Sequence, residues 1–553
     1  MRSAAGLGAG FLGFFSVTWA ATLLAAGPSD FDAAALDGAV RDVSGVLETG
    51  LISPPGKVRE QQPFQFKASD VEGAIDACVL ADMAWYDAPG GAVAVILDGE
   101  PLYEKGYGEK LRDSGQTVNP GTIFRIGPVT QQMTAAAVMQ QVELGRVALT
   151  DPITDLIPEF EVSGRWPADR ITVWNTLTHT TGFPDVLRSG SVQNENSLSM
   201  WAQRQDDIAL YAPPGSFWNY SNPGFMIAGL IAERAGGLNY RQLMKEDLWE
   251  PAGMSSTTFD PAEVVATGNY SYGHCWVCSA GGEVVVPPEE NDLWDVGPAG
   301  MAFSTVRDLA RWALLLMDGG GPVLSPRSAW AMQANQQWTH LTPEQFMGFG
   351  IINDSYHGLD VRLHPGGIKG YGSCLLWVPS RRFAVAVLAN STSDFTSAAR
   401  CIVDAVLDPE AVKLPDLSTD PSTWGRYEGD YLMTEANGYQ THLQVQLDDE
   451  RLMAEITDPA DPSFFYRTEL IQAYLDTFRL DSNADGNPDL DFTFCSRNGK
   501  PGFQMWMRNR QIVGERQLVP RTVRARRPSG VLSRSYLCPG FLLPTAHSNA
   551  RVP

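Results

Sequence analysis

Apolar and polar positions alternate in short blocks through the middle of this chain. Residues 91–97 form an unbroken apolar run, and the turn Asp98-Gly99 connects it to a mixed run over 101–108. Two β-rich runs around an Asp-Gly pair predict a β-hairpin. A stretch of good helix formers follows Pro128 and ends at Gly145, so a helix is predicted there.

A second run, residues 382–389, begins with Arg382 and is then apolar throughout, which predicts a buried strand far along the chain. Strands at both ends of a region with helices between them indicate an antiparallel sheet completed by non-adjacent segments, plus a helical insertion. Residues 84–410 are therefore predicted to form an α+β domain. The preceding segment, 28–83, is expected to lead into it through one helix near Ala68–Met83.

The pattern changes after residue 410. Residues 424–519 alternate apolar and polar positions between frequent turns, as over 441–447. This predicts a separate all-β domain within 411–519, either a small barrel or a sandwich. Residues 520–553 contain several arginines and no acidic residue, which is typical of a disordered basic tail.

The first 27 residues are read as a targeting segment. Met1-Arg2 precedes an apolar stretch, residues 4–26, that contains no charged residue. This is typical of a signal peptide, and its length also suits an uncleaved anchor. We therefore expect export, to a periplasm or the medium, with membrane attachment only through this segment if it is retained.

Composition limits the class of protein and its partners. The chain has 553 residues, a 44% hydrophobic content and a net charge of −23. The length indicates more than one domain, and the charge argues against a nucleic-acid partner. Seven cysteines leave room for one or two disulfides whose pairing the sequence does not define. Cys275 and Cys278 are expected to form a local disulfide or to be buried thiols, rather than a zinc or redox site.

Several spaced segments, in order, resemble the β-lactamase-related serine hydrolases, the group that holds β-lactamases, D,D-peptidases and related esterases. The supporting segments are 124–132, Thr178–Gly182, Gly253–Phe259 and Gly297–Thr305. The resemblance covers about residues 85–408. It implies the β-lactamase/D,D-peptidase fold, an antiparallel sheet flanked by helices with a helical subdomain, followed here by the C-terminal all-β domain.

The resemblance also implies a nucleophilic Ser and a basic Lys where this chain has Pro128 and Gln131. Proline has no nucleophilic atom and glutamine has no basic one. The backbone N–H of the family's serine is also one of two oxyanion donors, and proline has none. Losing one such donor costs about 3–4 kcal/mol of transition-state stabilisation. The second donor would come from Gly367. Proline suits a helix start, so the fold should survive these losses.

The other two family motifs are present. Tyr220-Ser221-Asn222 matches Tyr-x-Asn, whose Tyr moves a proton and whose Asn orients the substrate in the family. His364-Pro365-Gly366 matches His-x-Gly, expected on an edge strand beside the substrate. The predicted pocket therefore contains Tyr220, Asn222, His364 and Gly366. As single matches, both motifs are also compatible with a purely structural role.

No other residue is a convincing replacement for the lost pair. Thr130 should face away from the pocket because it lies two residues further along the helix. Gln132 is closer to the pocket face but is not a nucleophile. Lys369 should point to the strand face opposite His364 and Gly366.

One weak cation site is also considered. Asp481, Asn483 and Asp485 have the alternating oxygen ligands that open a calcium loop. The loop lacks the acidic twelfth ligand, so an acidic turn is an equally good interpretation. Structural calcium is the only cofactor considered.

Two hypotheses remain for function. The first is an exported pseudoenzyme that binds a small peptide, ester or cell-wall-like ligand. The second is an amide or ester hydrolase with a rebuilt mechanism, such as attack by water assisted by Tyr220 or His364.

Overall fold

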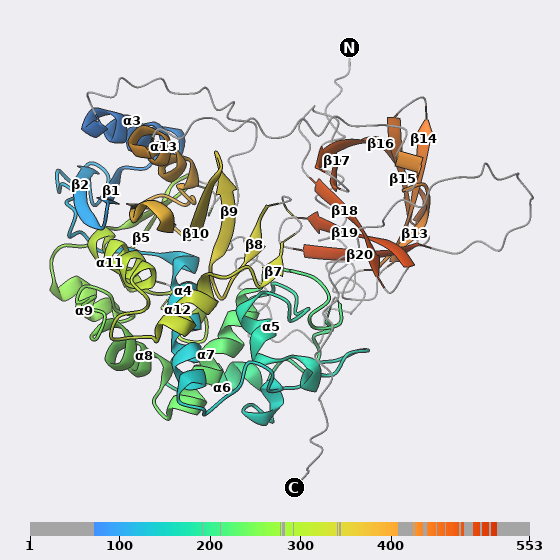
Figure 1. Ribbon diagram of the computed structural model, residues 1–553, viewed down its shortest axis with the longest axis horizontal. Helices are drawn as coiled ribbons and strands as arrows, with labels where there is room; N and C mark the ends of the chain where they lie inside the picture. The colour runs from blue at the N-terminus through green and yellow to red at the C-terminus, as the bar shows by residue number, and fades with distance from the viewer. Residues whose placement is uncertain are drawn as a thin grey trace, which may run out of the picture.

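The computed structural model describes most of residues 71–407 and the strand-forming segments of residues 424–516 (Figure 1). Undescribed positions within these ranges are 191, 211, 277, 279–281, 291, 340, 342–343, 426, 435–439, 449–450, 459–460, 475–476, 481–489, 498–499 and 508–509. The targeting segment, most of segment 28–83, the basic tail and the calcium candidates Asp481, Asn483 and Asp485 lie outside the described residues.

An eight-stranded sheet forms the centre of the larger part, with strand order β2-β1-β12-β11-β10-β9-β8-β7. The strands are β1 Gly90–Leu97, β2 Glu100–Gly108, β7 Gln337–Trp338, β8 Phe346–Met347, β9 Ile352–Tyr356, β10 Leu359–Ile368, β11 Tyr371–Val378 and β12 Phe383–Ala389. The hairpin β1–β2 confirms the Asp98-Gly99 prediction, and both turn residues have positive φ, at 53° and 86°. β1 pairs antiparallel with β12, so distant segments complete the sheet as predicted.

Both faces of the sheet are buried at its central strands β1, β11 and β12, which explains the unbroken apolar runs. On β12, Ala384, Ala386 and Leu388 belong to one hydrophobic core. The alternate residues Val385 and Val387 belong to a second core on the opposite face. Side chains of a strand point to opposite faces in turn, so one run supplies both cores.

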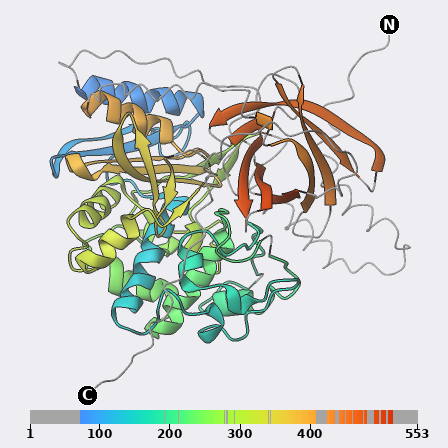
Figure 2. The same cartoon turned by 45° about the vertical axis from the view of Figure 1, so that its right-hand side comes forward.

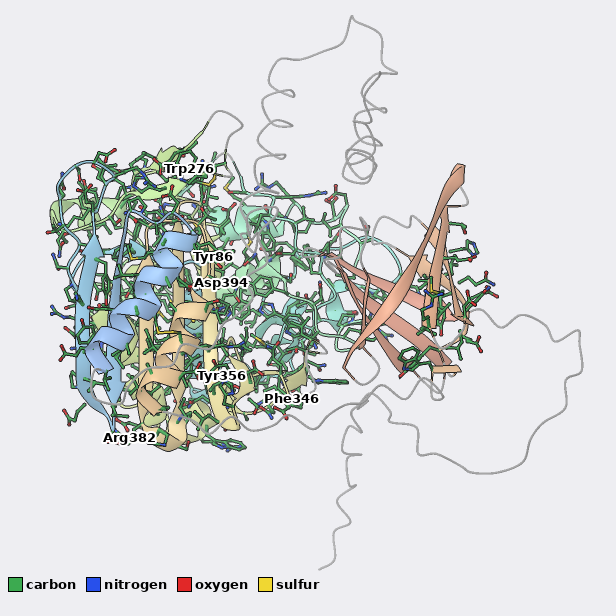
Figure 3. The ribbon with its side chains drawn as sticks, turned by 90° about the horizontal axis from the view of Figure 1, so that it is seen from above. Tyr86, Trp276, Phe346, Tyr356, Arg382 and Asp394 are labelled. Carbon is green, nitrogen blue, oxygen red and sulfur yellow. A yellow bond between two sulfur atoms is a disulfide. The ribbon has the colours of Figure 1, made fainter. Side chains whose placement is uncertain are left out.

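Two helices cover one face of the sheet (Figure 3). α3, Val71–Trp85, is the helix predicted near Ala68–Met83, and α13, Thr396–Leu407, lies beside it. A disulfide between Cys78 and Cys401 joins the two helices. Cys275 and Cys278 form the local disulfide that was one of the two expectations, and Cys374 is a buried free thiol.

The remaining helices lie on the opposite side of the sheet (Figure 2), where α11, Val306–Met317, packs directly against β1, β11 and β12. The predicted helix after Pro128 is α4, which ends just before Gly145, a residue with φ of 67°. These helices are α4 Thr130–Glu143, α5 Val173–Leu177, α6 Ser197–Ala202, α7 Asn222–Gly236, α8 Tyr240–Leu243, α9 Pro261–Ala266, α10 Gly297–Gly300, α11 Val306–Met317 and α12 Pro326–Gln333. Short strand pairs join β3 Phe124–Arg125 to β6 Phe303–Ser304, and β4 Gly273–Cys275 to β5 Val284–Val286. Among the described residues, no helix is long and apolar enough to cross a membrane.

The C-terminal strands form a closed barrel, which resolves the choice between barrel and sandwich. Its strands are β13 Gly429–Thr434, β14 Gln440–Asp448, β15 Arg451–Asp458, β16 Asp461–Tyr474, β17 Thr477–Leu480, β18 Leu490–Arg497, β19 Lys500–Met507 and β20 Arg510–Arg516. β20 pairs with β13 to close the barrel, so no strand is left as an edge.

The expectation that His364-Pro365-Gly366 lies on an edge strand is wrong for the strand as a whole. β10 lies between β11 and β9 in the sheet. Its pairing with β9 ends at Leu363, whereas its pairing with β11 continues to Ile368. The half of β10 that carries the motif is therefore paired on one side only, a setting that tolerates Pro365.

Candidate active site

The predicted site begins where β3 ends and α4 begins. Gly127, Pro128 and Val129 form one turn of 3-10 helix that leads directly into α4. Gly127 has a φ of 51°, a left-handed conformation that glycine adopts without strain. Pro128 lies in the first turn, where a missing N–H leaves no helical hydrogen bond unmade.

Backbone segments approach this turn closely from two sides. A Cβ built on Gly127 would lie 3.2 Å from the backbone nitrogen of Gly367. A Cβ built on Gly300, in α10, would lie 3.5 Å from the backbone nitrogen of Pro128. The structure therefore brings the first motif next to the Gly366–Gly367 segment of β10, as the family resemblance requires.

Gln131 occupies the position of the lost lysine and donates to the groups around it. Its Nε2 lies 2.8 Å from Tyr220 Oη and 3.1 Å from Asn222 Oδ1. The same nitrogen lies 3.3 Å from the carbonyl oxygen of Ala299. The two N–H groups of an uncharged amide are thus shared among three oxygens at the centre of the site, and Gln131 itself is fully buried.

The start of α7 positions the second motif. Ser221 is the helix N-cap, its Oγ accepts from the backbone N–H of Gly224, and Pro223 occupies the first turn. Asn222 begins the helix, and its backbone N–H donates to Asp185 Oδ1 at 2.8 Å. Its Nδ2 lies 3.4 Å from Asp185 Oδ2. The Asn222 amide is therefore oriented from both ends, by Gln131 and by Asp185.

His179 supports the Tyr220 loop from behind. Its ring lies 4.5 Å from the Tyr220 ring, centroid to centroid, and its Nδ1 accepts the Ser221 N–H at 3.1 Å. Its carbonyl oxygen accepts the Asn219 N–H at 2.7 Å. His179 has a φ of 55°, a strained value for a residue with a side chain. The motif loop is thus built on one buried, strained histidine.

His364 lies on the sheet side of the site and is neutral. Its Nδ1 donates to the carbonyl oxygen of Pro365 at 2.7 Å, which leaves Nε2 as an acceptor. Burial lowers the pKa of His364 to about 4. Burial also holds the pKa of His179 well below its usual value, and the nearby His364 lowers it further. Within the described residues, both buried Nε2 atoms lack a hydrogen-bond partner.

The site has a partly exposed front and a buried back. Pro128, Tyr220, Asp185 and Gly367 are partly exposed, whereas Gln131 and the two histidines are buried. Burial raises the pKa of Asp185 to about 7, although two donors of Asn222 oppose that change. Burial likewise raises the pKa of Tyr220 far above its usual value. Tyr220 is therefore a neutral hydroxyl at ordinary pH.

The three possible replacements for the lost serine and lysine form hydrogen bonds or ion pairs with groups outside the Tyr220 cluster. Thr130 is buried, and its Oγ1 donates to the Gly127 carbonyl at 2.7 Å. Gln132 accepts from the indole nitrogen of Trp312 at 3.1 Å. Lys369 pairs with Glu290 at 2.9 Å. None of the three supplies a nucleophile or a base to the Tyr220 cluster.

Sequence reasoning missed two members of the site, His179 and Asp185. His179 lies in the Thr178–Gly182 segment, which served only as a family landmark, and Asp185 lies just beyond that segment. A histidine and a Pro-Asp pair have no distinctive spacing to Tyr220 in the sequence. Only the fold shows that His179 and Asp185 lie beside Tyr220 and Asn222. In the described part of the chain, no cluster of three or more metal-ligating side chains occurs.

The fold and the three motif positions define the class that contains serine β-lactamases and penicillin-binding proteins. The profile of the Beta-lactamase family matches residues 75–407, and the chain belongs to this family.

Characterised relatives include a hydrolase and a penicillin-binding protein. Unguisins hydrolase ungD' of Aspergillus campestris is 29% identical over 350 residues, covering 61% of this chain and 65% of the relative. The match thus spans less than two thirds of that relative's length. Penicillin-binding protein 4 of Amycolatopsis lactamdurans is 28% identical over 354 residues, covering 61% and 90%. The crystal structure of SurE is similar in fold, with a TM-score of 0.60, 24% identity and coverage of 81% and 100%.

Proposed function

We propose that this chain is a non-catalytic member of its family that binds small peptide, ester or cell-wall-like ligands in the Tyr220, Asn222 and His364 pocket. The observation that carries the proposal is the setting of Gln131. Its amide donates to the hydroxyl of Tyr220, to Asn222 and to a backbone carbonyl. The amide nitrogen of Gln131 is not basic, so the position of the family's lysine supplies no proton acceptor.

The start of α4 supports the same conclusion. Pro128 offers neither a hydroxyl to attack a carbonyl carbon nor an N–H to stabilise an oxyanion. The remaining donor from the family's oxyanion hole, the N–H of Gly367, lies beside it. A ligand carbonyl can therefore be held by one backbone donor, and no covalent intermediate can form at this position.

The proposal is tested with wild-type protein and two covalent probes, a fluorescent penicillin and a fluorophosphonate. We expect no adduct by intact mass spectrometry, and reversible binding of acetylated D-alanyl-D-alanine derivatives by calorimetry. A covalent adduct that maps to the pocket would refute the proposal. Absence of binding by every peptide and ester tried would refute its ligand-binding half.

A second candidate is an amide or ester hydrolase in which water attacks directly. Two observations favour it: His364 has a free acceptor nitrogen, and Asp185 has a pKa of about 7. A group with a pKa near the working pH suits general base catalysis. This candidate predicts turnover of a chromogenic ester that disappears in Tyr220→Phe or His364→Ala. An Asp404→Asn variant, altered on α13 outside the site, is the matched control.

We also propose that the protein is exported, because residues 4–26 are apolar and uncharged after Met1-Arg2. Expression of the full chain in a secreting host, followed by N-terminal sequencing of the released protein, tests this. Cleavage near Ala25–Gly27 supports a signal peptide. Retention in the membrane fraction with an intact N-terminus would support the anchor instead.

A further inference from the structure

The charges around the pocket differ from those that a serine hydrolase of this class requires. The central position has a neutral amide in place of an ammonium group, because Gln131 replaces lysine. His364 is neutral, since its Nδ1–H is used by the Pro365 carbonyl and its Nε2 is an acceptor. Neither motif therefore supplies a positive charge.

The cationic side chains that flank the motifs are already engaged. Arg125, two residues before Gly127, is buried and donates to the carbonyls of Met301 and Pro288 at 3.0 and 2.9 Å. Lys369, two residues after Gly367, is paired with Glu290. Neither side chain is free to meet an anion in the pocket.

The front of the pocket carries an uncompensated carboxyl group. Asp185 is partly exposed, and it accepts hydrogen bonds from the backbone N–H and the Nδ2 of Asn222. No lysine or arginine of the described residues pairs with it. A second carboxyl, Asp295, is buried and accepts from Ser189 Oγ and the Gly190 N–H on the loop that carries Asp185. The local charge is therefore neutral to negative.

We propose that this pocket selects ligands that present a neutral amide or ester end and discriminates against ligands with a free carboxylate. The inference rests on the proposed function, because it assumes that the pocket binds a peptide-like ligand. A carboxylate placed near Gln131 would lose its hydration without gaining an ionic partner, and it would face Asp185. An amide can instead accept from the Gly367 N–H and donate to the oxygens of the Asn222 and Asp185 pair.

The test compares two ligands that differ at one end, acetyl-D-alanyl-D-alanine and its C-terminal amide, by calorimetry with the full chain. We expect the amide to bind at least about tenfold more tightly, the scale of one hydrogen bond to a charged group. Equal binding of the two, or tighter binding of the acid, would overturn the selection but leave ligand binding intact. Failure of both peptides to bind would overturn this inference, and failure of every other peptide and ester as well would overturn the ligand-binding half of the proposed function.

Two variants sharpen the comparison. Gln131→Lys places an ammonium group among the same three acceptors, and we expect it to reduce or reverse the preference for the amide. Gln140→Lys adds the same charge to α4 more than two turns further on, about 13 Å away, and should leave the preference unchanged. Asp185→Asn removes the negative charge and should improve acid binding several-fold, which provides a test even if Gln131→Lys does not fold. An unchanged preference in both Gln131→Lys and Asp185→Asn would overturn the inference.

Discussion

The two sides of the site differ in how much of the family's motifs they keep. At the start of α4, the nucleophile, the base and one oxyanion donor of the family are absent at Pro128 and Gln131. At the start of α7, Tyr220 and Asn222 are retained and held by His179, Asp185 and Gln131. The family's nucleophile and base are missing on one side, whereas hydrogen bonds hold the retained Tyr220 and Asn222 on the other.

Under the proposed function, this contrast indicates a site that is rebuilt rather than decayed. Loss of the lysine without a replacement would remove a donor from the oxygens of Tyr220, Asn222 and Ala299, and Asn222 Oδ1 would keep only the Tyr220 hydroxyl, 3.3 Å away. A buried acceptor left unpaired costs about 1–3 kcal/mol. Gln131 supplies the donor, although its own buried Oε1 has no partner among the described residues. The hydrogen bonds at the lysine position are thus kept without a basic group.

The largest effect is expected at His179, on the retained side. His179→Ala removes the ring under Tyr220 and the acceptor of the Ser221 N–H, and we expect a loss of about 3 kcal/mol in the free energy of unfolding. Urea denaturation measures it. His357→Ala, which alters a partly exposed histidine outside the site, is the control and should change stability by less than about 0.5 kcal/mol. A similarly small change for His179→Ala would contradict the interpretation that His179 stabilises the Tyr220 loop.

The next effect concerns pH and Asp185. Its folded pKa, about 7, is raised above the value of an unfolded aspartate, so the folded state binds this proton more tightly. Its contribution to stability is then greatest below about pH 4 and is lost as the pH rises to about 7. Asp185→Asn should abolish this trend, with a difference of about 2 kcal/mol, reduced because the side chain is partly exposed. Unfolding curves of both proteins between pH 4 and 8 test it; parallel curves would contradict it.

A smaller effect is expected at Gln131, on the altered side. Gln131→Met keeps the size of the side chain but removes the donor, and we expect a loss of about 1 kcal/mol in the free energy of unfolding. The loss is limited because the Tyr220 hydroxyl can still donate to Asn222 Oδ1, which lies 3.3 Å away. Thermal unfolding measures it. If Gln131→Met were more stable than wild type, the amide would not be holding the two sides together.

The smallest effect is expected at Pro128. Pro128→Ser leaves the helix start intact and mainly increases the freedom of the unfolded chain, so a loss of less than about 1 kcal/mol is expected. Guanidinium denaturation of the single variant checks this. A loss of several kcal/mol would mean that Pro128 has a structural role which the first turn of α4 does not show.

Much of the fold was predictable because its strands are buried on both faces. Residues 91–97 and 383–389 are unbroken apolar runs, and they lie in β1 and β12 near the centre of the sheet. The alternation after residue 424 likewise predicted the all-β domain. Short strands such as β7 and β8 have no such run, so the sheet extends beyond the predicted edge at His364.

The site was predictable only where a motif marks it. Pro128, Gln131, Tyr220, Asn222 and His364 were found from family spacing. The roles of His179 and Asp185 depend on a strained turn after α5 and on the direction of the α7 N-terminus, which only tertiary packing defines. The Cys78–Cys401 pairing was beyond sequence reasoning for the same reason, since the two cysteines are 323 residues apart.

Restoring the lost pair tests the central claim most directly. Wild type and the double variant Pro128→Ser/Gln131→Lys are incubated with a fluorescent penicillin and a chromogenic ester, and adducts and turnover are measured side by side. The account predicts neither adduct nor turnover in wild type, and a covalent adduct at residue 128 in the double variant. Turnover by wild type that is lost in Tyr220→Phe would contradict it and establish a hydrolase without the family's serine.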